Sequence, residues 1–465
     1  MYQIDFTQPC SVYFVGIGGI SMSGLAEILN DAGFKVSGSD RSKSSLTEAL
    51  SQKGITIFYG QRSENITSDI DCMVLTSAIR EDNPEYIAAK EKNIPMLSRA
   101  QLLGQIMKNY KTSVAISGTH GKTTTTSMIS EILLAADTDP TLLEGGILKS
   151  IGGNLRIGSS EFFVTEACEY TNSFLSFFPT IGLILNIEED HLDFFKDIND
   201  IRNSFHEFAK LLPKDGCLII SGDIPNYKEI VGDLDCKIVT FGKTETTSEN
   251  EATDYYASDI TYNKLGHATF KLHSKTKPVR EFTLKVPGAH NIQNAIASVA
   301  LADTLLLEDE PIISALSKFT GADRRFEYKG TIGGVTVIDD YAHHPTEITA
   351  TLTAAKNIEH NTLWCVFQPH TYTRTKAFMG DFAKALSLAD KVILADIYAA
   401  RETDNLGISS KTLQKEIQAL GCECFHFPTF DEIENFLLEN CINDDMLITM
   451  GAGDVHKIGE NLLGI

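Results

Sequence analysis

The sequence has few basic residues for its size and no long apolar segment. Its 40 lysines and arginines are outnumbered by 62 aspartates and glutamates, which gives a formal net charge of -22. This balance argues against a large nucleic-acid-binding face, because such a face needs clustered basic side chains. No apolar run approaches the roughly 20 residues that a membrane-spanning helix needs, so we expect no insertion into a membrane.

Disulfide and export signals are also missing. The nine cysteines are odd in number and scattered, and the only close pair is Cys422 and Cys424, so neither a disulfide framework nor a zinc site is indicated. The first residues, MYQIDFTQPC, lack the basic segment and apolar core of a signal peptide. We therefore expect a cytoplasmic protein.

Short apolar runs alternate with helical patterns in three successive segments, which predicts an α/β protein with three domains. We expect Rossmann-like, doubly wound domains at 1–108 and 321–465. Between them, 109–320 should form a parallel sheet. Short alternating runs within 252–286 predict a small antiparallel meander in this central domain.

The most specific motif joins the apolar strand SVAISG to a predicted helix. It consists of Gly118, Thr119, His120, Gly121, Lys122, Thr123 and Thr124. Glycines allow successive backbone N–H groups to face phosphate oxygens, and the helix N-terminus adds positive potential. Lys122 can reach the β- and γ-phosphates, and Thr123 can give its hydroxyl to Mg²⁺. Ile116 stands where the general Walker pattern has its first glycine, so Gly118 takes that role. A chance glycine-rich turn is the alternative, but the strand–loop–helix setting favours a P-loop ATPase-like central domain.

Acidic residues and a histidine follow the next strands. Glu166 ends the strand FFVTEA, and His191 follows the strand in LILNIEEDHLDFF. Ligands collect at the carboxyl ends of parallel strands, so both side chains could converge on the phosphates. A carboxylate suits Mg²⁺, whereas a histidine on its own is better explained by a structural hydrogen bond. Spacing does not rank the neighbouring carboxylates, which are Glu169, Glu188, Glu189 and Asp190.

Two further segments could reach a nucleotide. His290, Asn291 and Asn294 surround the start of a predicted helix, and helix capping is an equally good explanation for the asparagines. Arg324 and Arg325 lie at the predicted junction between the second and third domains, where an arginine could meet a phosphate.

The first domain offers a rival function. Gly16 and Gly18 follow a strand, and Asp40 ends the next strand about twenty residues later, as in dinucleotide-binding proteins. Ser21 stands at the third glycine position. A nicotinamide-dependent dehydrogenase would leave the 118–124 loop without a purpose, and a non-catalytic nucleotide-binding regulator is a further alternative.

Taken together, the motifs resemble those of the Mur ligases, the cytoplasmic enzymes that assemble the peptide stem of peptidoglycan. The resemblance spans essentially the whole chain and is strongest to the alanine-adding branch. It rests on GIGGISMSG (16–24), GTHGKTT (118–124), NIEEDHLD (186–193), PGAHNIQNA (287–295), GADRRF (321–326), DDYAHHPTE (339–347), FQPHTYTRT (367–375) and IYAARE (397–402).

The resemblance implies ATP- and Mg²⁺-dependent ligation, with Mn²⁺ as a possible substitute, of L-alanine to the carboxylate of UDP-N-acetylmuramate through an acyl phosphate. It implies a UDP-sugar site in the first domain that includes Gly16, Gly18, Gly19, Ser21, Ser39, Asp40 and Ser77. ATP would contact the 118–124 loop together with His290, Asn291, Asn294 and Arg324. The metal ligands would be Thr123, Glu166 and His191. The amino acid would meet Tyr341, His343, Arg374 and Arg401. The catalytic group would consist of Lys122, Glu166, His191, His343 and Arg374.

Two departures from the family pattern concern substrate recognition. Cys168 and Thr171 stand where many members carry aspartates, and Thr371 stands where an arginine is common. A ligase that attaches a preformed peptide to the same sugar nucleotide during wall recycling remains an alternative. The expected partners are small molecules alone, and the chain is expected to be a monomer or a homodimer.

Overall fold

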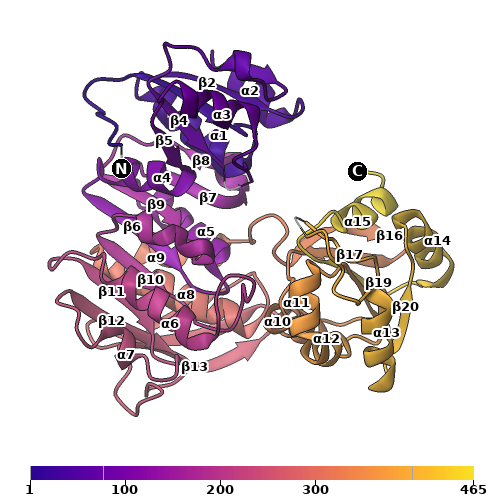
Figure 1. The fold of residues 1–465 in the computed structure, drawn as a ribbon. Coiled ribbons are helices and arrows are strands. Elements are labelled where there is room, and N and C mark those ends of the chain that lie inside the picture. Colours follow the sequence, from indigo (N-terminus) through magenta and orange to yellow (C-terminus); the bar gives the residue numbers. More distant parts are fainter. Residues whose placement is uncertain (1, 77, 401) are drawn as a thin grey trace.

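The computed structural model describes residues 2–76, 78–400 and 402–465. Ser77 and Arg401, both named above as candidate site residues, therefore lie outside the described residues. Three sheets follow one another along the chain, and each forms the centre of an α/β domain (Figure 1). The predicted three-domain α/β class, with parallel sheets and an antiparallel meander, is confirmed. None of the described helices combines the length and the apolar character that crossing a membrane requires.

The first domain is a five-stranded parallel sheet in the order β3-β2-β1-β4-β5. The central strand β1 is buried along its whole length, as expected for a strand covered by helices on both faces. The strands are β1 Ser11–Val15, β2 Lys35–Asp40, β3 Thr56–Tyr59, β4 Cys72–Leu75 and β5 Met96–Ser98, and the helices are α1 Ile20–Asp31, α2 Ser45–Gln52, α3 Pro84–Glu91 and α4 Arg99–Met107.

The middle domain is built on a ten-stranded sheet in the order β15-β14-β13-β12-β11-β10-β6-β9-β7-β8. Its central strands are parallel, while β14, β15 and β8 run antiparallel to their neighbours. The strands are β6 Thr112–Ser117, β7 Thr141–Leu148, β8 Gly153–Arg156, β9 Phe162–Glu166, β10 Ile181–Ile184, β11 Cys217–Ser221, β12 Lys237–Gly242, β13 Tyr255–Tyr262, β14 Ala268–Ser274 and β15 Arg280–Thr283. The helices are α5 Lys122–Ala135, α6 Ile198–Ala209, α7 Lys228–Val231, α8 Ala289–Thr304 and α9 Asp309–Lys318, with a short 3-10 segment, η3, at Tyr170–Ser176.

The meander is an extension of the central sheet, because β13 pairs in parallel with β12. The antiparallel β7–β8 hairpin at the opposite edge is an addition that the sequence did not predict. It carries the glycine pair at 145 and 146 towards the carboxyl end of β9.

The third domain has a six-stranded sheet in the order β16-β17-β21-β18-β19-β20. Five strands are parallel, and the edge strand β16 is antiparallel to β17. The strands are β16 Glu327–Ile332, β17 Val335–Asp340, β18 Leu363–Phe367, β19 Lys391–Leu394, β20 Glu423–His426 and β21 Met446–Met450. The helices are α10 Pro345–Lys356, α11 Tyr372–Ala377, α12 Met379–Leu386, α13 Ser410–Ala419, α14 Phe430–Asn440 and α15 His456–Leu463.

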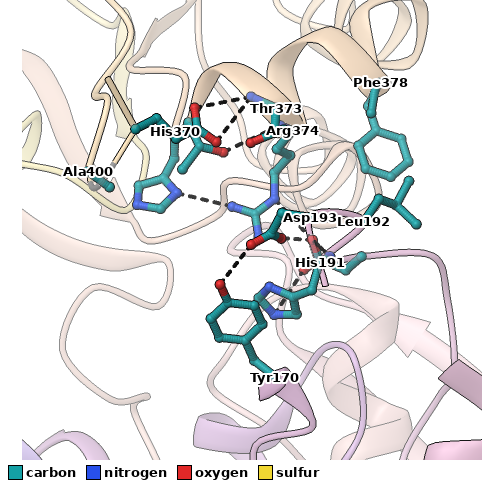
Figure 2. A pocket seen from close by; sticks show the side chains of 13 residues that line it. Tyr170, His191, Leu192, Asp193, His370, Thr373, Arg374, Phe378 and Ala400 are labelled. Atoms are coloured by element: carbon teal, nitrogen blue, oxygen red, sulfur yellow. Dashed lines mark hydrogen bonds and ion pairs between the residues drawn. The ribbon is translucent and has the colours of Figure 1, made fainter. Parts of the chain in front are cut away.

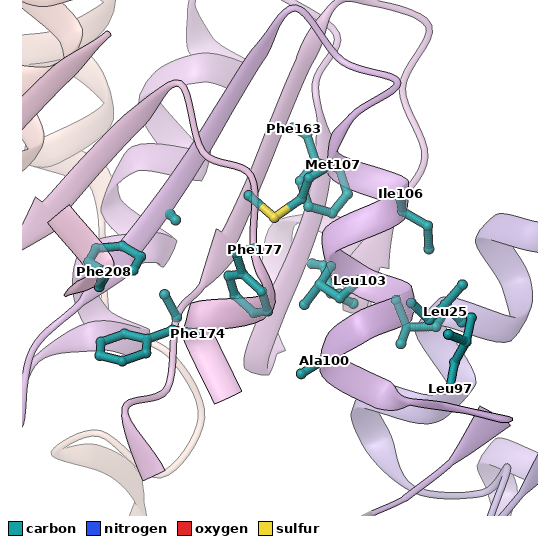
Figure 3. Packing of buried hydrophobic residues seen from close by; sticks show 14 of the residues in the cluster. Leu25, Leu97, Ala100, Leu103, Ile106, Met107, Phe163, Phe174, Phe177 and Phe208 are labelled. Carbon is teal, nitrogen blue, oxygen red and sulfur yellow. The ribbon is translucent and has the colours of Figure 1, made fainter. Parts of the chain in front are cut away.

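The first two domains share one hydrophobic cluster. Helix α4 packs Met107 beside Phe163 of the middle sheet and Leu103 towards Phe177, just beyond η3, while Ile106 lies on the opposite side of the helix (Figure 3). The third domain has hydrophobic clusters of its own, built from its own strands and helices. Its contacts with the middle domain include the Arg374–Asp190 ion pair and the hydrogen bond from Thr346 to Glu188. A polar boundary of this kind is easier to open than an apolar one, which makes the third domain the natural moving part.

Candidate active site

A cavity of about 620 Å³ lies where the middle domain faces the third. The middle domain contributes the loop before α5 and the carboxyl ends of β9 and β10, and the third domain contributes the segments around β16 and β17. The lining includes Lys122, Thr123, Glu166, Glu169, His191, Arg324, Arg325, Tyr341 and His343. The carboxyl ends of parallel strands thus supply most of the polar groups, as expected for an open α/β sheet.

The loop between β6 and α5 has a shape that depends on glycine. Gly118 has φ +144° and Gly121 has φ +83°, both in the region that favours residues without a side chain. A Cβ on Gly121 would also lie 2.6 Å from Asn294 Oδ1. Asn186 holds the loop from the other side, because its amide accepts the N–H of His120 (2.8 Å) and donates to the His120 carbonyl (3.0 Å). The loop is therefore fixed before α5 begins.

Lys122, the first residue of α5, lies against a carboxylate that the sequence left unranked. Its ammonium is 3.0 Å from Glu169 Oε2, and it also donates to the carbonyls of Gly118 and Thr119. Burial alone would lower the pKa of Lys122, but the charge of Glu169 outweighs it and raises that pKa above its usual value. The side chain of Glu169 is only 3% exposed. A fully charged lysine is thus held at the mouth of the loop.

Glu166 is positioned by the β7–β8 hairpin. The N–H of Gly145 donates to Glu166 Oε1 at 2.9 Å, and a Cβ on Gly145 would lie 2.5 Å from the same oxygen. A Cβ on the neighbouring Gly146 would lie 3.2 Å from Thr123 Cγ2. The glycine pair therefore lets the hairpin lie directly over Glu166 and Thr123, which brings an acidic group and a hydroxyl to the same side of the cavity.

His191 is held in a left-handed backbone conformation, with φ +53°. Its ring stacks on Tyr170 with centroids 4.4 Å apart, and its Nε2 lies 3.7 Å from Glu169 Oε1. Burial lowers the pKa of His191 in spite of the nearby carboxylates of Asp190 and Glu169. The imidazole is consequently neutral near pH 7, which is the form that binds a metal.

Arg374 joins the third domain to the middle domain. Its Nη2 lies 2.9 Å from Asp190 Oδ1, and both side chains are less than one-tenth exposed. Its Nη1 lies 3.1 Å from His370 Nδ1. Figure 2 shows Arg374 and His370 at a second cavity of about 380 Å³, whose lining shares Asp190 and His191 with that of the first. Arg374, expected to face the amino acid, therefore lines a cavity while it is paired with Asp190.

The other expected nucleotide contacts divide into two groups. Asn291 and Asn294 are linked by a 3.1 Å hydrogen bond, and Asn294 lies against Gly121 of the loop. The capping alternative fails for both, because Gly288 is the N-cap of α8 and no side chain caps it. His290 is exposed beside them.

The two arginines at the junction differ in their contacts. Arg324 donates to Asp339 Oδ2 (2.9 Å) and to the carbonyl of Gly451 (2.7 Å), both within the third domain. Arg325 reaches the loop instead, and its Nη2 donates to Thr123 Oγ1 at 3.3 Å. Arg325, rather than Arg324, thus makes the contact across the domain boundary.

Tyr341 and His343 follow β17 on the third-domain side of the cavity. His343 Nδ1 lies 3.0 Å from the Tyr341 carbonyl and 3.5 Å from Glu347 Oε2. Burial lowers the pKa of His343 to about 4, although Glu347 opposes the change. With Nδ1 committed as a donor, the neutral ring offers Nε2 as an acceptor.

Five residues at the same boundary, His120, Glu188, His344, Thr346 and Glu347, make up what we term the junction cluster. His120 lies between two carboxylates, with Nδ1 3.2 Å from Glu347 Oε1 and Nε2 3.4 Å from Glu188 Oε2. Burial would lower the pKa of His120, but these carboxylates raise it to about 9. Thr346 donates to Glu188 Oε2 at 2.6 Å, and His344 Nε2 lies 3.1 Å from the carbonyl of Glu189.

The glycine loop of the first domain joins β1 to α1. Gly16 has φ +79°, and the N–H of Gly18 donates to Asp40 Oδ2 at 2.8 Å, so the turn and the end of β2 meet as expected. Gly19 is the N-cap of α1, and Ser21 lies in its first turn. The side chain of Ser39 is fully buried, and its hydroxyl donates to Glu85 Oε2 (2.6 Å).

Sequence reasoning missed or failed to rank several residues that the structure brings to this boundary. They are Arg325, Glu169, Asp190, Glu347 and His370. The roles of Arg325, Glu169 and Asp190 become clear only from contacts with residues far away in the sequence, which are Thr123, Lys122 and Arg374 respectively.

Three protein-family profiles match successive segments of the chain, and all three describe Mur ligase domains. The Mur ligase family catalytic-domain profile matches residues 11–111, the Mur ligase middle-domain profile matches 116–302, and the Mur ligase glutamate ligase domain profile matches 324–453.

Full-length relatives and solved structures agree with these profiles. A UDP-N-acetylmuramate–L-alanine ligase of Agathobacter rectalis is 59% identical over 463 residues, and one of Lachnospira eligens is 58% identical, in both cases over 100% of each chain. A crystal structure of the UDP-N-acetylmuramate-alanine ligase of Thermotoga maritima is 30% identical, with a TM-score of 0.81 over 98% of each chain. A murein peptide ligase of Psychrobacter arcticus has the same fold, with a TM-score of 0.72 and 23% identity over 98% of each chain.

Proposed function

Because this chain belongs to the Mur ligase family, we propose that it joins L-alanine to the carboxylate of UDP-N-acetylmuramate at the expense of ATP, in the synthesis of peptidoglycan precursors. Relatives at 58–59% identity over the whole chain carry this activity in their names. The observation that carries the proposal is the cavity in which the phosphate-binding loop and the carboxyl ends of β9 and β10 face the third domain.

In the first step, a carboxylate oxygen of the sugar nucleotide attacks the γ-phosphorus of ATP. The bond from that phosphorus to the β–γ bridging oxygen breaks, leaving an acyl phosphate and ADP. Both reactants are anions, so the site must offset their repulsion. Lys122 supplies a charge that Glu169 holds in place, and Arg325 reaches Thr123 from the third domain. The loop amides and the start of α5 add to this positive potential.

The donor set suits Mg²⁺, since the cavity brings together the Thr123 hydroxyl, the Glu166 and Glu169 carboxylates and a neutral His191. We propose Thr123, Glu166 and His191 as the residues that hold it, with Mn²⁺ as an alternative ion. When bound, the ion clamps the phosphates and neutralises developing charge. The N–H of Gly145 fixes Glu166, and Tyr170 fixes the ring of His191.

In the second step, the amine of L-alanine attacks the acyl carbon. The amide C–N bond forms, the C–O bond to phosphate breaks, and phosphate leaves while the amine loses a proton. Tyr341 and His343 line the cavity on the side that the amino acid would approach, and Nε2 of the neutral His343 can accept a hydrogen bond from the amine. The Arg374–Asp190 pair holds the third domain against the middle domain. Water, which would hydrolyse the acyl phosphate, is thereby kept out.

The closest rival attaches a preformed peptide to the same sugar nucleotide. To separate the two, the purified chain is incubated with UDP-N-acetylmuramate, ATP, Mg²⁺ and either L-alanine or a tripeptide, and the products are weighed by mass spectrometry. We expect the mass of the alanyl conjugate in the first reaction and none of the peptide conjugate in the second. A peptide conjugate formed in preference would overturn the assignment.

A dehydrogenase is disfavoured by the same cavity, because Lys122 and the loop at 118–124 would then serve no bound phosphate. Reduction of a substrate with NADH, without ATP consumption, would restore that alternative.

A further inference from the structure

The junction cluster combines metal-binding side chains that the proposed reaction does not use. His120 comes from the loop after β6, Glu188 follows β10, and His344 precedes α10 of the third domain. One ligand atom from each of these three residues lies within 4.8 Å of the other two. Two histidines and a carboxylate are a set that favours Zn²⁺ and related ions over Mg²⁺.

Within the described parts of the chain, the nitrogen of His120 that faces Glu188 has no hydrogen-bond partner. Its Nε2 is buried, and it lies 3.4 Å from Glu188 Oε2 without the geometry of a hydrogen bond. Two ligands bound tetrahedrally to one zinc ion, at bond lengths of about 2.0–2.2 Å, are separated by about 3.4 Å. The two atoms are thus spaced as if they shared an ion.

The residues around these ligands orient them as in known metal sites. A metal-binding histidine usually donates its second ring N–H to a carboxylate or carbonyl, which fixes the ring. His120 Nδ1 lies 3.2 Å from Glu347 Oε1, and Glu188 Oε2 accepts the Thr346 hydroxyl at 2.6 Å. His120 and Glu188 are thus each held by a side chain of the third domain, Glu347 for the first and Thr346 for the second.

We propose that His120, Glu188 and His344 form a transition-metal site for Zn²⁺ or an ion of similar preference, separate from the Mg²⁺ ligands, with water completing the coordination. The ligand atom of His344 lies within 4.8 Å of the other two, so it must approach by up to about 1.4 Å to reach the spacing of bound ligands. It must also release one backbone contact, either Nε2 to Glu189 O or Nδ1 to the N–H of Thr346. The metal ion and a proton compete for Nε2 of His120, because a metal binds only the unprotonated nitrogen.

An ion at this position would tie the phosphate-binding loop to the third domain. His120 and Glu188 belong to the middle domain, and His344 belongs to the third, so all three ligands are available only when the domains are closed. The bound ion would therefore hold the closed form and slow the opening that product release needs.

The test measures metal binding by the full-length chain in the absence of substrates. After chelation, the protein is titrated with Co²⁺ in excess Mg²⁺, which saturates the oxygen-rich site, and visible absorption reports tetrahedral Co²⁺. We expect one tightly bound Co²⁺ that is displaced by one equivalent of Zn²⁺. We expect Glu188→Gln and His344→Asn each to weaken it at least 10-fold, and Asn keeps an acceptor for the N-terminus of α10.

Three further variants decide the location. His267→Gln removes a histidine at the distant β13–β14 turn and should leave Co²⁺ binding unchanged. His191→Ala should also leave it unchanged, because that residue belongs to the proposed Mg²⁺ site. Glu347→Gln should weaken Co²⁺ about 10- to 100-fold by removing the outer partner of His120. The proposal would be overturned if the unaltered chain gave no tetrahedral Co²⁺ signal, or if Glu188→Gln and His344→Asn bound Co²⁺ as tightly as the unaltered chain. It would also be overturned if only His191→Ala lost the signal.

Discussion

A single methyl group at Gly145 should disturb the metal site without replacing any of the proposed ligands. Gly145 is exposed in the β7–β8 hairpin, and its N–H donates to Glu166 Oε1. In Gly145→Ala the new Cβ would lie 2.5 Å from Glu166 Oε1 and 2.7 Å from the carboxyl carbon of Glu166. The Cβ is fixed to the backbone of the hairpin, whereas the atoms that it meets are at the end of the Glu166 side chain. The Glu166 carboxylate is therefore the group that must move.

The size of the effect follows from the required shift. Ordinary contact begins at 3.4 Å, so the carboxylate must retreat by about 0.9 Å. A displacement of about 1 Å in a catalytic group can cost about 100-fold in rate. We therefore expect the Mg²⁺ concentration for half-maximal phosphate release to rise about 10- to 100-fold, with little change in thermal stability because Gly145 is exposed.

Gly153→Ala is the matched control, since it lies in the same hairpin and its Cβ would meet nothing within 4 Å. Its Mg²⁺ titration should match that of the unaltered chain. If Gly145→Ala and Gly153→Ala gave the same titration, Glu166 would not be a metal ligand held by this hairpin.

Three other variants test separate parts of the account. Lys122→Ala should abolish phosphate release while calorimetry still detects UDP-sugar binding to the first domain; loss of both together would contradict the assignment of these domains. Arg374→Gln leaves the buried Asp190 carboxylate without its cation. This should destabilise the closed form by about 3–5 kcal/mol and lower kcat/KM at least 100-fold. The control Lys376→Gln, on the exposed side of α11, should change neither. Burial raises the pKa of Glu144 to about 8, so the stability linked to its proton is complete below about pH 4.5 and is lost as pH rises through about 8. The Tm of the unaltered chain should therefore fall relative to that of Glu144→Gln between pH 5 and pH 9, and parallel Tm curves would show that Glu144 is ionised throughout.

The α/β order and the phosphate-binding loop could be predicted because both are written in local sequence. Apolar runs of strand length alternate with helical patterns, and the 118–124 motif combines glycines, a lysine and hydroxyls between a strand and a helix. The antiparallel meander was equally visible as short alternating runs. The β7–β8 hairpin was not, because its TLLEGGIL segment has no period of its own and is defined by pairing with β9.

The cavity was only partly predictable, because its remaining groups depend on how two domains meet. Nothing in the sequence distinguishes Glu169 from Glu189, yet the first contacts Lys122 at 3.0 Å while the second offers its carbonyl to His344. Likewise, adjacent arginines 324 and 325 point to different partners because residue 324 has φ +59°. For Asn291 and Asn294, the sequence predicts helix capping and nucleotide contact equally well. The structure shows no side-chain cap on α8 and places Asn294 against Gly121 of the phosphate-binding loop.

The central claim is that the sugar carboxylate takes the γ-phosphoryl group of ATP in the cavity at Lys122, and oxygen transfer tests it directly. UDP-N-acetylmuramate labelled with ¹⁸O in both carboxylate oxygens is converted with L-alanine and ATP, and the released phosphate is analysed by mass spectrometry. Attack on the γ-phosphorus predicts one ¹⁸O in each phosphate and one in the amide. Unlabelled phosphate, with amide formed at the normal rate, would contradict the account.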